Sequence, residues 1–313
     1  MICQAEIIIE PAEAGVRLDH VLANRFPASS RSLVIRAIEN GDVLLNGKSA
    51  RKGNKVISGS IVFVKQLPEN DDLVVTPNPE IPLSILYEDA ALLVLNKPAG
   101  IPVHPIEYTD TQTLANGLVA RFPELGAVGS DRLFPSFVHR LDTDTSGVLV
   151  AAKNNAGHEA LRKQFGTRQI SKKYIALAHG QIAKADHLVH FLAHSAVNGQ
   201  HRMRALEKPV EHDRRPALRA VTDYTLRHAY AVYSLLDVII HTGITHQIRC
   251  QLAASGHPVA GDVLYGCSEP DFIRRLCLHA SELELTHPLT GQRLRFEAPL
   301  PPDFTAILEA LDP

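Results

Sequence analysis

A stretch rich in proline and acidic residues divides the sequence into two parts that must fold separately. It contains four prolines and four carboxylates, which are Pro68, Glu69, Asp71, Asp72, Pro77, Pro79, Glu80 and Pro82. Proline cannot donate a backbone hydrogen bond, so such a stretch is neither a helix interior nor a central strand. We place a linker at residues 76–82, between an N-terminal domain (1–75) and a larger domain (83–313). The length of 313 residues fits two domains at roughly 150 residues each.

The composition is that of a globular protein, and we expect it to work in the cytoplasm. Hydrophobic residues make up 45% and charged residues 21% of the chain, as in ordinary folded domains. The longest apolar runs, 90–95 and 147–152, are far shorter than the ~18 residues that span a bilayer, so no membrane association is expected. Residues 1–13 carry three glutamates and no lysine or arginine, unlike a secretory signal. The four cysteines are expected to be incidental reduced thiols: Cys3, Cys250, Cys267 and Cys277.

Positive charge is concentrated in the first domain. The whole chain has a net charge of −2, yet the segment from Arg17 to Lys65 holds nine basic and three acidic residues. That segment therefore carries +6 and leaves −8 for the rest of the chain. A cationic patch on a nearly neutral protein is typical of a nucleic-acid-binding module. The alternative is a solvated basic face without a polyanionic partner.

Local patterns in the same domain predict a small α+β unit. Capping serines and an apolar stripe predict a helix over residues 29–41. Residues 43–45 and 60–64 are predicted strands, and Asn46-Gly47 indicates a tight hairpin. These features resemble the RNA-binding domain named after ribosomal protein S4. The resemblance implies that basic residues dock RNA, and the candidates are Arg17, Arg31, Arg36, Lys48, Arg51 and Lys52.

The larger domain is expected to be α+β, with a mixed, mainly antiparallel sheet. Its connections are too short for repeated crossover helices, which favours antiparallel pairing. Residues 221–227 and 233–241 are expected to pair directly as an antiparallel ladder. The other predicted strands are 85–87, 92–96, 147–152 and 174–179, and the predicted helices are 113–121, 156–164 and 245–254.

The most informative motif is VHRLDTDTSG at residues 138–147, which leads directly into an apolar strand. A polar loop held by a rigid strand is a suitable place for a catalytic carboxylate. Taken alone, the motif carries little weight, because Asp and Thr before a strand more often form turns.

The complete string resembles the signature of the RluA family of RNA pseudouridine synthases. Further blocks follow the family's order: LNKPAG at 95–100 with His104-Pro105, KKY at 172–174, and TGITHQIR at 242–249 followed by GHP at 256–258 and GDVLYG at 261–266. The resemblance covers about residues 83–300, and the S4-like domain fits an extra module that many members carry. It implies conversion of uridine to pseudouridine in RNA without a cofactor, a nucleotide or a metal.

The resemblance also implies three catalytic residues. Asp142 matches the family's aspartate, which attacks the nucleotide covalently or takes a sugar proton; the sequence leaves both routes open. Arg249 matches the arginine that pairs with this aspartate, for which a bidentate contact is expected. Tyr174 matches the tyrosine whose ring stacks on the target uracil.

Five further positions are expected to contact the substrate or lie beside it. Arg140 is expected to fill the space of the extracted base or hold its backbone, although a structural ion pair with Asp144 is the alternative. Ile248 is expected to pack on the uracil face. The remaining three are assigned only to the neighbourhood of the site: Lys97, His104 and Lys173.

One departure from the family concerns the RNA target. The family usually has arginine where this chain has Ile244, which suggests that a phosphate or backbone contact is missing. Because members with the extra module resemble this chain, large-subunit (23S) ribosomal RNA is favoured over transfer RNA. We expect the protein to be a monomer.

Two other functions are weighed against this reading. The first is a non-catalytic RNA-binding or ribosome-assembly protein, for which the low aromatic content and Ile244 leave room. The second is a metal-dependent hydrolase, because His187, His190 and His194 would share one face if their segment were helical. The segment lacks a cysteine or carboxylate that would complete a known zinc pattern, and no metal site is predicted.

Overall fold

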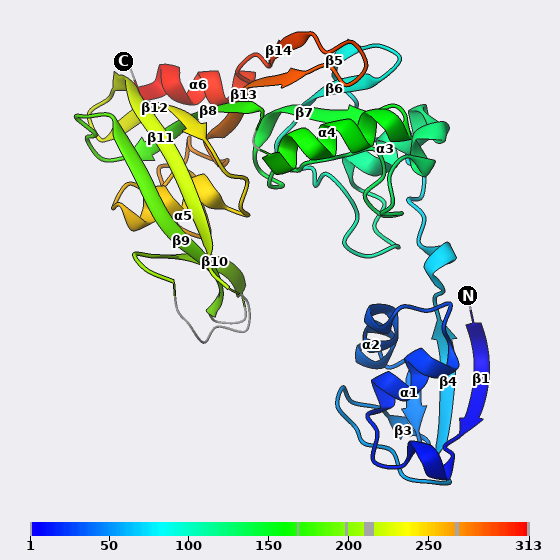
Figure 1. Ribbon diagram of the computed structural model, residues 1–313. Helices are drawn as coiled ribbons and strands as arrows, with labels where there is room; N and C mark the ends of the chain where they lie inside the picture. Colours follow the sequence, from blue (N-terminus) through cyan, green and yellow to red (C-terminus); the bar gives the residue numbers. More distant parts are fainter. Residues whose placement is uncertain (1, 168, 198–199, 210–215, 267–268, 312–313) are drawn as a thin grey trace. The chain divides into compact units, whose positions relative to one another are not determined.

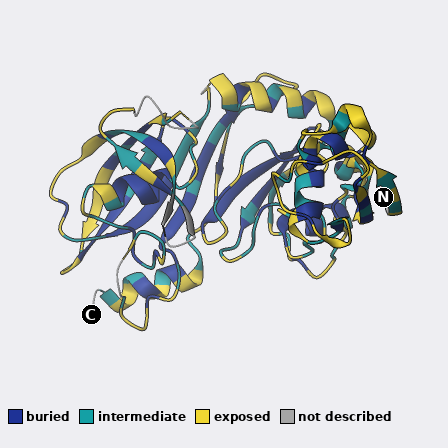
Figure 2. Ribbon diagram, turned by 90° about the horizontal axis from the view of Figure 1, so that it is seen from below, coloured by how far each residue is buried: buried dark blue, intermediate teal, exposed yellow. Residues whose placement is uncertain are grey.

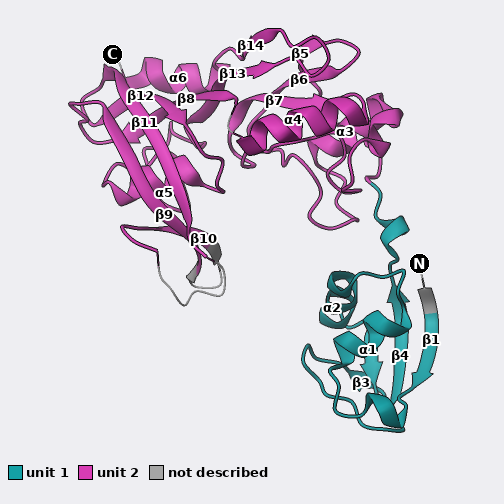
Figure 3. Cartoon of the chain, in the orientation of Figure 1, with its two compact units in different colours: residues 1–74 teal, residues 75–313 magenta. Residues whose placement is uncertain are grey.

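The chain folds into two compact units, Met1–Val74 and Val75–Pro313 (Figure 3). The division falls within the stretch that contains Pro68 to Pro82, just before the linker that we place at residues 76–82. The computed structural model describes all residues except 1, 168, 198–199, 210–215, 267–268 and 312–313. In the described part, no helix is long and apolar enough to cross a membrane. Cys250 and Cys277 are buried free thiols, whereas Cys267 and the side chain of Cys3 lie outside the described residues.

The N-terminal unit is an antiparallel sheet with two α-helices and two short 3-10 helices (Figure 1). The strand order is β1-β4-β2-β3, and the strands are β1 (Ile2–Ile8), β2 (Val43–Leu45), β3 (Lys48–Ser49) and β4 (Ile61–Leu67). The helices are α1 (Leu18–Arg25), α2 (Arg31–Glu39) and the short 3-10 helices η1 (Pro11–Glu13) and η2 (Asn70–Asp72). Neither β1 nor α1 was predicted from the sequence.

The predicted helix and hairpin of this unit are both present. Ser30 caps α2, because its Oγ accepts a hydrogen bond from the Leu33 backbone N–H at 3.5 Å. The hairpin between β2 and β3 turns at Asn46 and Gly47, whose φ angles of 51° and 77° are the left-handed values that a tight hairpin needs. The apolar stripe of α2 is buried, as predicted, and consists of Leu33, Val34, Ala37 and Ile38.

The larger unit is built on one ten-stranded sheet in the order β10-β9-β11-β12-β8-β13-β7-β6-β5, with β14 paired to β13. Its pairs are antiparallel except for β7 and β13, so the expected mainly antiparallel α+β fold is confirmed. The predicted ladder is β11 against β12. The strands are β5 (Ile85–Glu88), β6 (Leu92–Lys97), β7 (Ser146–Ala152), β8 (Ser171–His179), β9 (Asp186–Val197), β10 (Gln200–Leu206), β11 (Leu218–Ala229), β12 (Tyr233–Ile240), β13 (Leu278–Thr286) and β14 (Arg293–Glu297).

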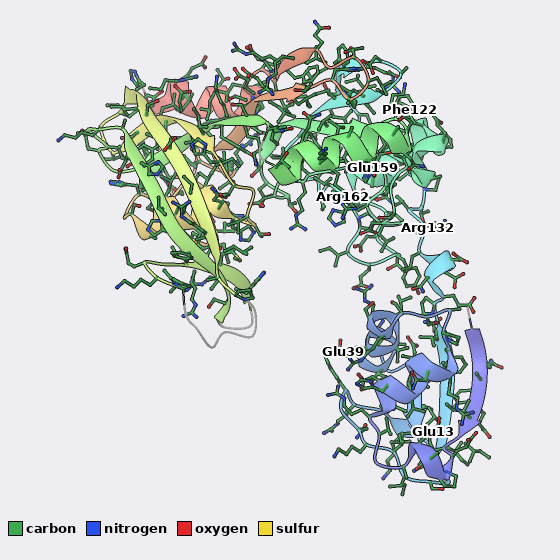
Figure 4. The ribbon with its side chains drawn as sticks, in the orientation of Figure 1. Glu13, Glu39, Phe122, Arg132, Glu159 and Arg162 are labelled. Carbon is green, nitrogen blue, oxygen red and sulfur yellow. The ribbon has the colours of Figure 1, made fainter. Side chains whose placement is uncertain are left out.

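Helices cover the sheet and close its apolar cores. They are α3 (Leu114–Arg121), η3 (Pro123–Ala127), α4 (Asn155–Thr167), α5 (Gln247–Ala254) and α6 (Pro302–Leu311). Alternate residues of β8 serve two cores: Ala176 joins the main one, and Leu177 packs with Phe304 of α6. In Figure 2 the strands are largely buried, and Glu159 and Arg162, labelled in Figure 4, lie on the exposed face of α4.

The parallel pair β7–β13 depends on a glycine. At Gly147 the backbone has φ 117°, and a Cβ atom there would lie 2.1 Å from the Ala280 carbonyl oxygen. No larger residue fits without moving β13 away from β7. Gly147 therefore fixes the start of the strand that follows the VHRLDTDTSG motif.

The histidine segment is a strand and not the helix that a shared face requires. His187, His190 and His194 all lie on β9. Successive side chains of a strand point to opposite faces, so His187 and His190 are on different sides of the sheet. Their partners agree: His187 contacts Asp223, while His190 lies 3.2 Å from the Gln251 side-chain amide. The interpretation of these residues as one helical face is wrong.

Candidate active site

A cavity of about 520 Å³ opens in the larger unit, where three separate segments meet. Most of its walls come from residues 138–145 before β7, from β8, and from residues 240–249, which include the first turn of α5; α4, β11 and β13 also contribute. The first and last of the three main segments are about 100 residues apart in the sequence, and the ten-stranded sheet brings them together. Five of the eight catalytic and substrate-binding candidates line the cavity, and they are Arg140, Asp142, Tyr174, Ile248 and Arg249.

The loop that carries Asp142 is held from behind by a buried lysine. Lys97, at the end of β6, has no exposed surface, and its Nζ donates to the carbonyl oxygens of Pro98 and Thr143, each at 2.7 Å. The Gly100 backbone N–H also donates to Thr143 O at 2.9 Å. Burial lowers the pKa of Lys97 to about 7, against the opposing effect of Asp144 and Asp142. Lys97 does not line the cavity; it fixes the backbone next to Asp142.

Arg249 joins Asp142 to a second carboxylate, that of Asp262. One guanidinium nitrogen, Nη1, donates to Asp142 Oδ2 at 2.9 Å. Nε and Nη2 donate to the two oxygens of Asp262 at 2.7 and 2.9 Å. Arg249 therefore makes a single hydrogen bond to Asp142, and the bidentate contact expected there is made with Asp262 instead. Burial favours the neutral form of Arg249, yet the two carboxylates outweigh it and raise its pKa, so the guanidinium stays charged.

Asp262 was not identified from the sequence, although it lies in the GDVLYG block. It has 2% of its surface exposed, and its Oδ1 also accepts the backbone N–H groups of Leu264 and Tyr265 at 2.9 and 3.0 Å. Burial raises the pKa of Asp262, but the bonds from Arg249 and these amides lower it overall. The sequence offered one indication of its role, because Asp262 lies between the two glycines and close to the tyrosine of the GDVLYG block. Its partner Arg249, however, is 13 residues away in the chain.

His246 also faces Asp142 and was not selected from the sequence. Its Nε2 lies 3.9 Å from Asp142 Oδ2, and its Nδ1 lies 3.1 Å from the hydroxyl of Tyr265. It precedes α5 with left-handed backbone angles (φ 55°, ψ 22°), which are uncommon for a residue with a side chain. Burial lowers the pKa of His246, and Asp142 acts in the opposite direction. The imidazole is therefore neutral near pH 7.

Strand β8 presents alternate residues to the cavity. Tyr174 lines it with 8% of its surface exposed. Burial, and then the Asp142 charge, raise the pKa of this phenol far above its usual value, so it stays protonated. Lys172, two residues earlier, lines the cavity too and donates to Thr242 O at 3.1 Å. Lys173 points to the other face and pairs with Glu282 at 2.7 Å, outside the cavity.

The other candidates differ in their surroundings. Arg140 is exposed at the cavity, and among the described residues it makes no ion pair with Asp144. His104 lies outside the cavity lining and packs edge-on against the Phe134 ring, with ring centres 4.6 Å apart. Ile248 is a buried wall residue, and Ile244 lines the same cavity with an apolar side chain.

In the N-terminal unit, two of the RNA-docking candidates also have a structural task. Arg17 and Arg31 both bond the fully buried carboxylate of Asp19, at 2.9 and 2.7 Å, while remaining 40% and 47% exposed. Burial raises the pKa of Asp19, but the two arginines lower it overall. Lys52 pairs with Glu39, labelled in Figure 4, at 3.6 Å. Lys48 and Arg51 are exposed.

Comparison with known proteins assigns each of the two units to a protein family. Residues 91–254 match the family model described as RNA pseudouridylate synthase, and residues 16–60 match that of the S4 domain. The chain belongs to the RNA pseudouridylate synthase family. The expected resemblance to the RluA family and its S4-like domain is confirmed, and the protein is an RNA pseudouridine synthase.

Relatives match this pseudouridine synthase along nearly its whole length. The ribosomal large subunit pseudouridine synthase D of Xanthomonas campestris is 35% identical, covering 98% of this chain and 92% of the relative. The protein of the same name from Xylella fastidiosa is 38% identical, covering 95% and 89%. Among solved structures, human RNA pseudouridylate synthase domain containing 1 is 27% identical with a TM-score of 0.57, covering 75% of this chain and 96% of that one.

Proposed function

We propose that this pseudouridine synthase modifies one or more uridines of large-subunit (23S) ribosomal RNA, with Asp142 as its catalytic carboxylate. The observation that carries the proposal is the Asp142 side chain, which enters the cavity with 19% of its surface exposed and is bonded by Arg249 at 2.9 Å. The two relatives named as ribosomal large subunit pseudouridine synthases support the choice of RNA. Such a substrate places the enzyme in the cytoplasm, where we propose that it acts as a monomer.

The reaction moves the uracil from one attachment to another on the same ribose. The bond between N1 and C1′ breaks, a bond between C5 and C1′ forms, the C5 proton leaves, and N1 gains a proton. Asp142 either attacks C1′ or removes the C2′ proton, and Arg249 supports both routes by keeping a positive charge beside the carboxylate. Because Asp262 holds the rest of the guanidinium, Arg249 presents a single N–H to Asp142.

The remaining wall residues suit a flipped uridine. Ile248 supplies an apolar surface and Tyr174 a neutral aromatic ring, against which a uracil can pack. Arg140 is exposed at the cavity and is suited to occupy the place that the base leaves in its stem. The exposed cations Lys48 and Arg51 of the S4 domain would contribute salt-sensitive RNA affinity.

Pseudouridine mapping tests both the reaction and the target. Ribosomal and transfer RNA are mapped from cells without the gene, and from the same cells carrying wild type or Asp142→Ala. We expect at least one uridine of large-subunit RNA to lose its modification in the deletion and regain it only with wild type. Restoration by Asp142→Ala would overturn the role of Asp142, and a change confined to transfer RNA would overturn the proposed target.

Purified Asp142→Asn separates an enzyme from a binding protein. The amide keeps the size of the side chain but cannot act as a nucleophile or base of the required strength. We expect product formation to fall below detection, while affinity for the RNA stays within about threefold of wild type. Loss of binding together with activity would mean that Asp142 acts through structure.

A further inference from the structure

His246 is fixed by its neighbours so that one ring nitrogen faces the catalytic carboxylate. The Tyr265 hydroxyl accepts a hydrogen bond from the Met203 backbone N–H at 2.7 Å and lies 3.1 Å from His246 Nδ1. The two rings also meet edge to face, with centres 5.6 Å apart. Tyr265 in turn is anchored through its own backbone N–H, which donates to Asp262. His246 is therefore held by a chain of contacts that does not pass through Asp142.

The surroundings of the ring favour one position for its proton. Burial raises the pKa of Tyr265 to about 12, so its hydroxyl keeps its proton. We assign the Tyr265 proton to Nδ1 of the neutral imidazole, because the phenol oxygen already accepts from Met203 and because the Asp142 carboxylate favours an N–H on the facing Nε2. Nδ1 is then an acceptor, and Nε2 carries the ring N–H. This N–H points towards Asp142, from inside the cavity that His246 and Asp142 both line.

The separation of the donor and the carboxylate matches the size of one hydroxyl group. At 3.9 Å, His246 Nε2 and Asp142 Oδ2 are too far apart for a direct hydrogen bond. An oxygen placed about 2.8 Å from each would accept from Nε2–H and donate to Oδ2. A ribose carries such a group next to both carbons that Asp142 is proposed to reach, because the 2′-hydroxyl is attached to C2′ and neighbours C1′.

We propose that His246 is a specificity-determining residue that binds the 2′-hydroxyl of the target nucleotide. It thereby restricts the reaction to a ribose at that position and aligns the sugar against Asp142. A 2′-hydroxyl is the group by which a protein distinguishes RNA from DNA at a given site. This proposal rests on the proposed role of Asp142. It adds that the 2′-hydroxyl of the substrate is recognised next to the Asp142 carboxylate.

Three variants and two substrates test the proposal. His246→Asn tolerates left-handed backbone and keeps an acceptor for Tyr265, but it lacks a donor at the position of Nε2. His246→Gln places an amide N–H near that position. Tyr265→Phe removes only the hydroxyl that directs the imidazole. Each enzyme is assayed with the RNA fragment found by mapping, carrying either uridine or 2′-deoxyuridine at the target, and thermal unfolding checks that the variants are folded.

The result expected is a loss that depends on the 2′-hydroxyl. For wild type, 2′-deoxyuridine should lower kcat/KM by roughly tenfold to a hundredfold, the effect of losing a hydrogen bond to a charged group, here the Asp142 carboxylate. His246→Asn should lose a similar factor on uridine and less than threefold on 2′-deoxyuridine, whereas His246→Gln and Tyr265→Phe should lie between. Equal losses by His246→Asn on both substrates would overturn the proposal. Product formed by Asp142→Ala is a separate outcome, which would overturn the proposed function instead.

Discussion

Asp262 holds two of the three guanidinium nitrogens of Arg249, so the arginine is fixed before it meets the catalytic aspartate. Nε and Nη2 lie 2.7 and 2.9 Å from the Asp262 oxygens, and only Nη1 is left for Asp142. A bidentate pair of this kind sets direction as well as charge. The position of the charge beside Asp142 is therefore determined by a residue that does not line the cavity.

Replacing Asp262 should reduce catalysis more than substrate binding. In Asp262→Asn one carboxylate oxygen becomes an N–H₂ group, which opposes the guanidinium and leaves Arg249 free to turn. We expect kcat to fall at least tenfold with KM within about threefold, measured on a transcript that contains the target uridine. Asp237→Asn is the matched control, because Asp237 pairs with Arg227 at the surface. A drop in affinity of the same size as the drop in rate would contradict this role.

The sequence predicted the elements whose pattern is local and missed those that depend on distant partners. The apolar runs of β6 and β7 and the capped stripe of α2 are visible without knowing their neighbours. β13 is not, because its buried positions are interrupted by polar residues such as His279 and Glu282, whose partners lie elsewhere in the chain.

The same distinction applies to the site. Asp142, Tyr174 and Arg249 were assigned through resemblance, because nothing in residues 138–147 alone separates a catalytic aspartate from a turn former. Asp262 acquires its role only when the fold brings it to Arg249. Lys172 could have been found, because period-two alternation along a strand places it on the same face as Tyr174 and places Lys173 on the other.

Lys97 should support activity by holding the catalytic loop. Lys97→Met leaves the carbonyl oxygens of Pro98 and Thr143 without their buried donor. We expect the free energy of unfolding to fall by about 1–3 kcal/mol and the single-turnover rate to fall at least tenfold at a temperature where the variant is folded. Lys153→Met, which breaks an ion pair with Glu88, serves as the control and should cost less than about 1 kcal/mol. A full single-turnover rate in a folded Lys97→Met enzyme would argue against the positioning role.

His139 should make the protein less stable in acid. Its Nε2 accepts the Val150 backbone N–H at 3.0 Å, and its ring stacks on Phe165. Burial, and then the charge of Lys172, lower its pKa from 6.5 to about 3. Between these two values the unfolded chain binds a proton that the folded protein does not, so stability falls as the pH falls from 6.5 towards 3.

A variant that keeps the acceptor but cannot titrate tests this linkage. His139→Gln offers its side-chain oxygen to Val150 N–H. Urea unfolding at pH 7, 6, 5 and 4.5 should show a smaller decline in the free energy of unfolding for His139→Gln than for wild type. Parallel declines for the two proteins would mean that His139 contributes nothing to the acid sensitivity.

Lys172 and Lys173 provide a matched pair in which neighbouring residues of one strand should behave differently. Lys172 faces the cavity, whereas Lys173 pairs with Glu282 on the opposite side, and Glu282 also has Arg295 as a partner. Lys172→Met removes a positive charge from the wall that a polyanion would approach. We expect it to raise KM for RNA at least fivefold and to reduce the slope of log affinity against log salt concentration by about 1.

Lys173→Met removes the same charge from the same strand and should leave KM and the salt dependence within about twofold of wild type. Because Arg295 still pairs with Glu282, the substitution does not leave this buried carboxylate without a cationic partner. Fluorescence anisotropy with the target fragment at several salt concentrations measures both variants under identical conditions. Equal effects of the two substitutions would show that net charge matters more than the face of β8, and the assignment of Lys172 to the RNA-binding wall would then fail.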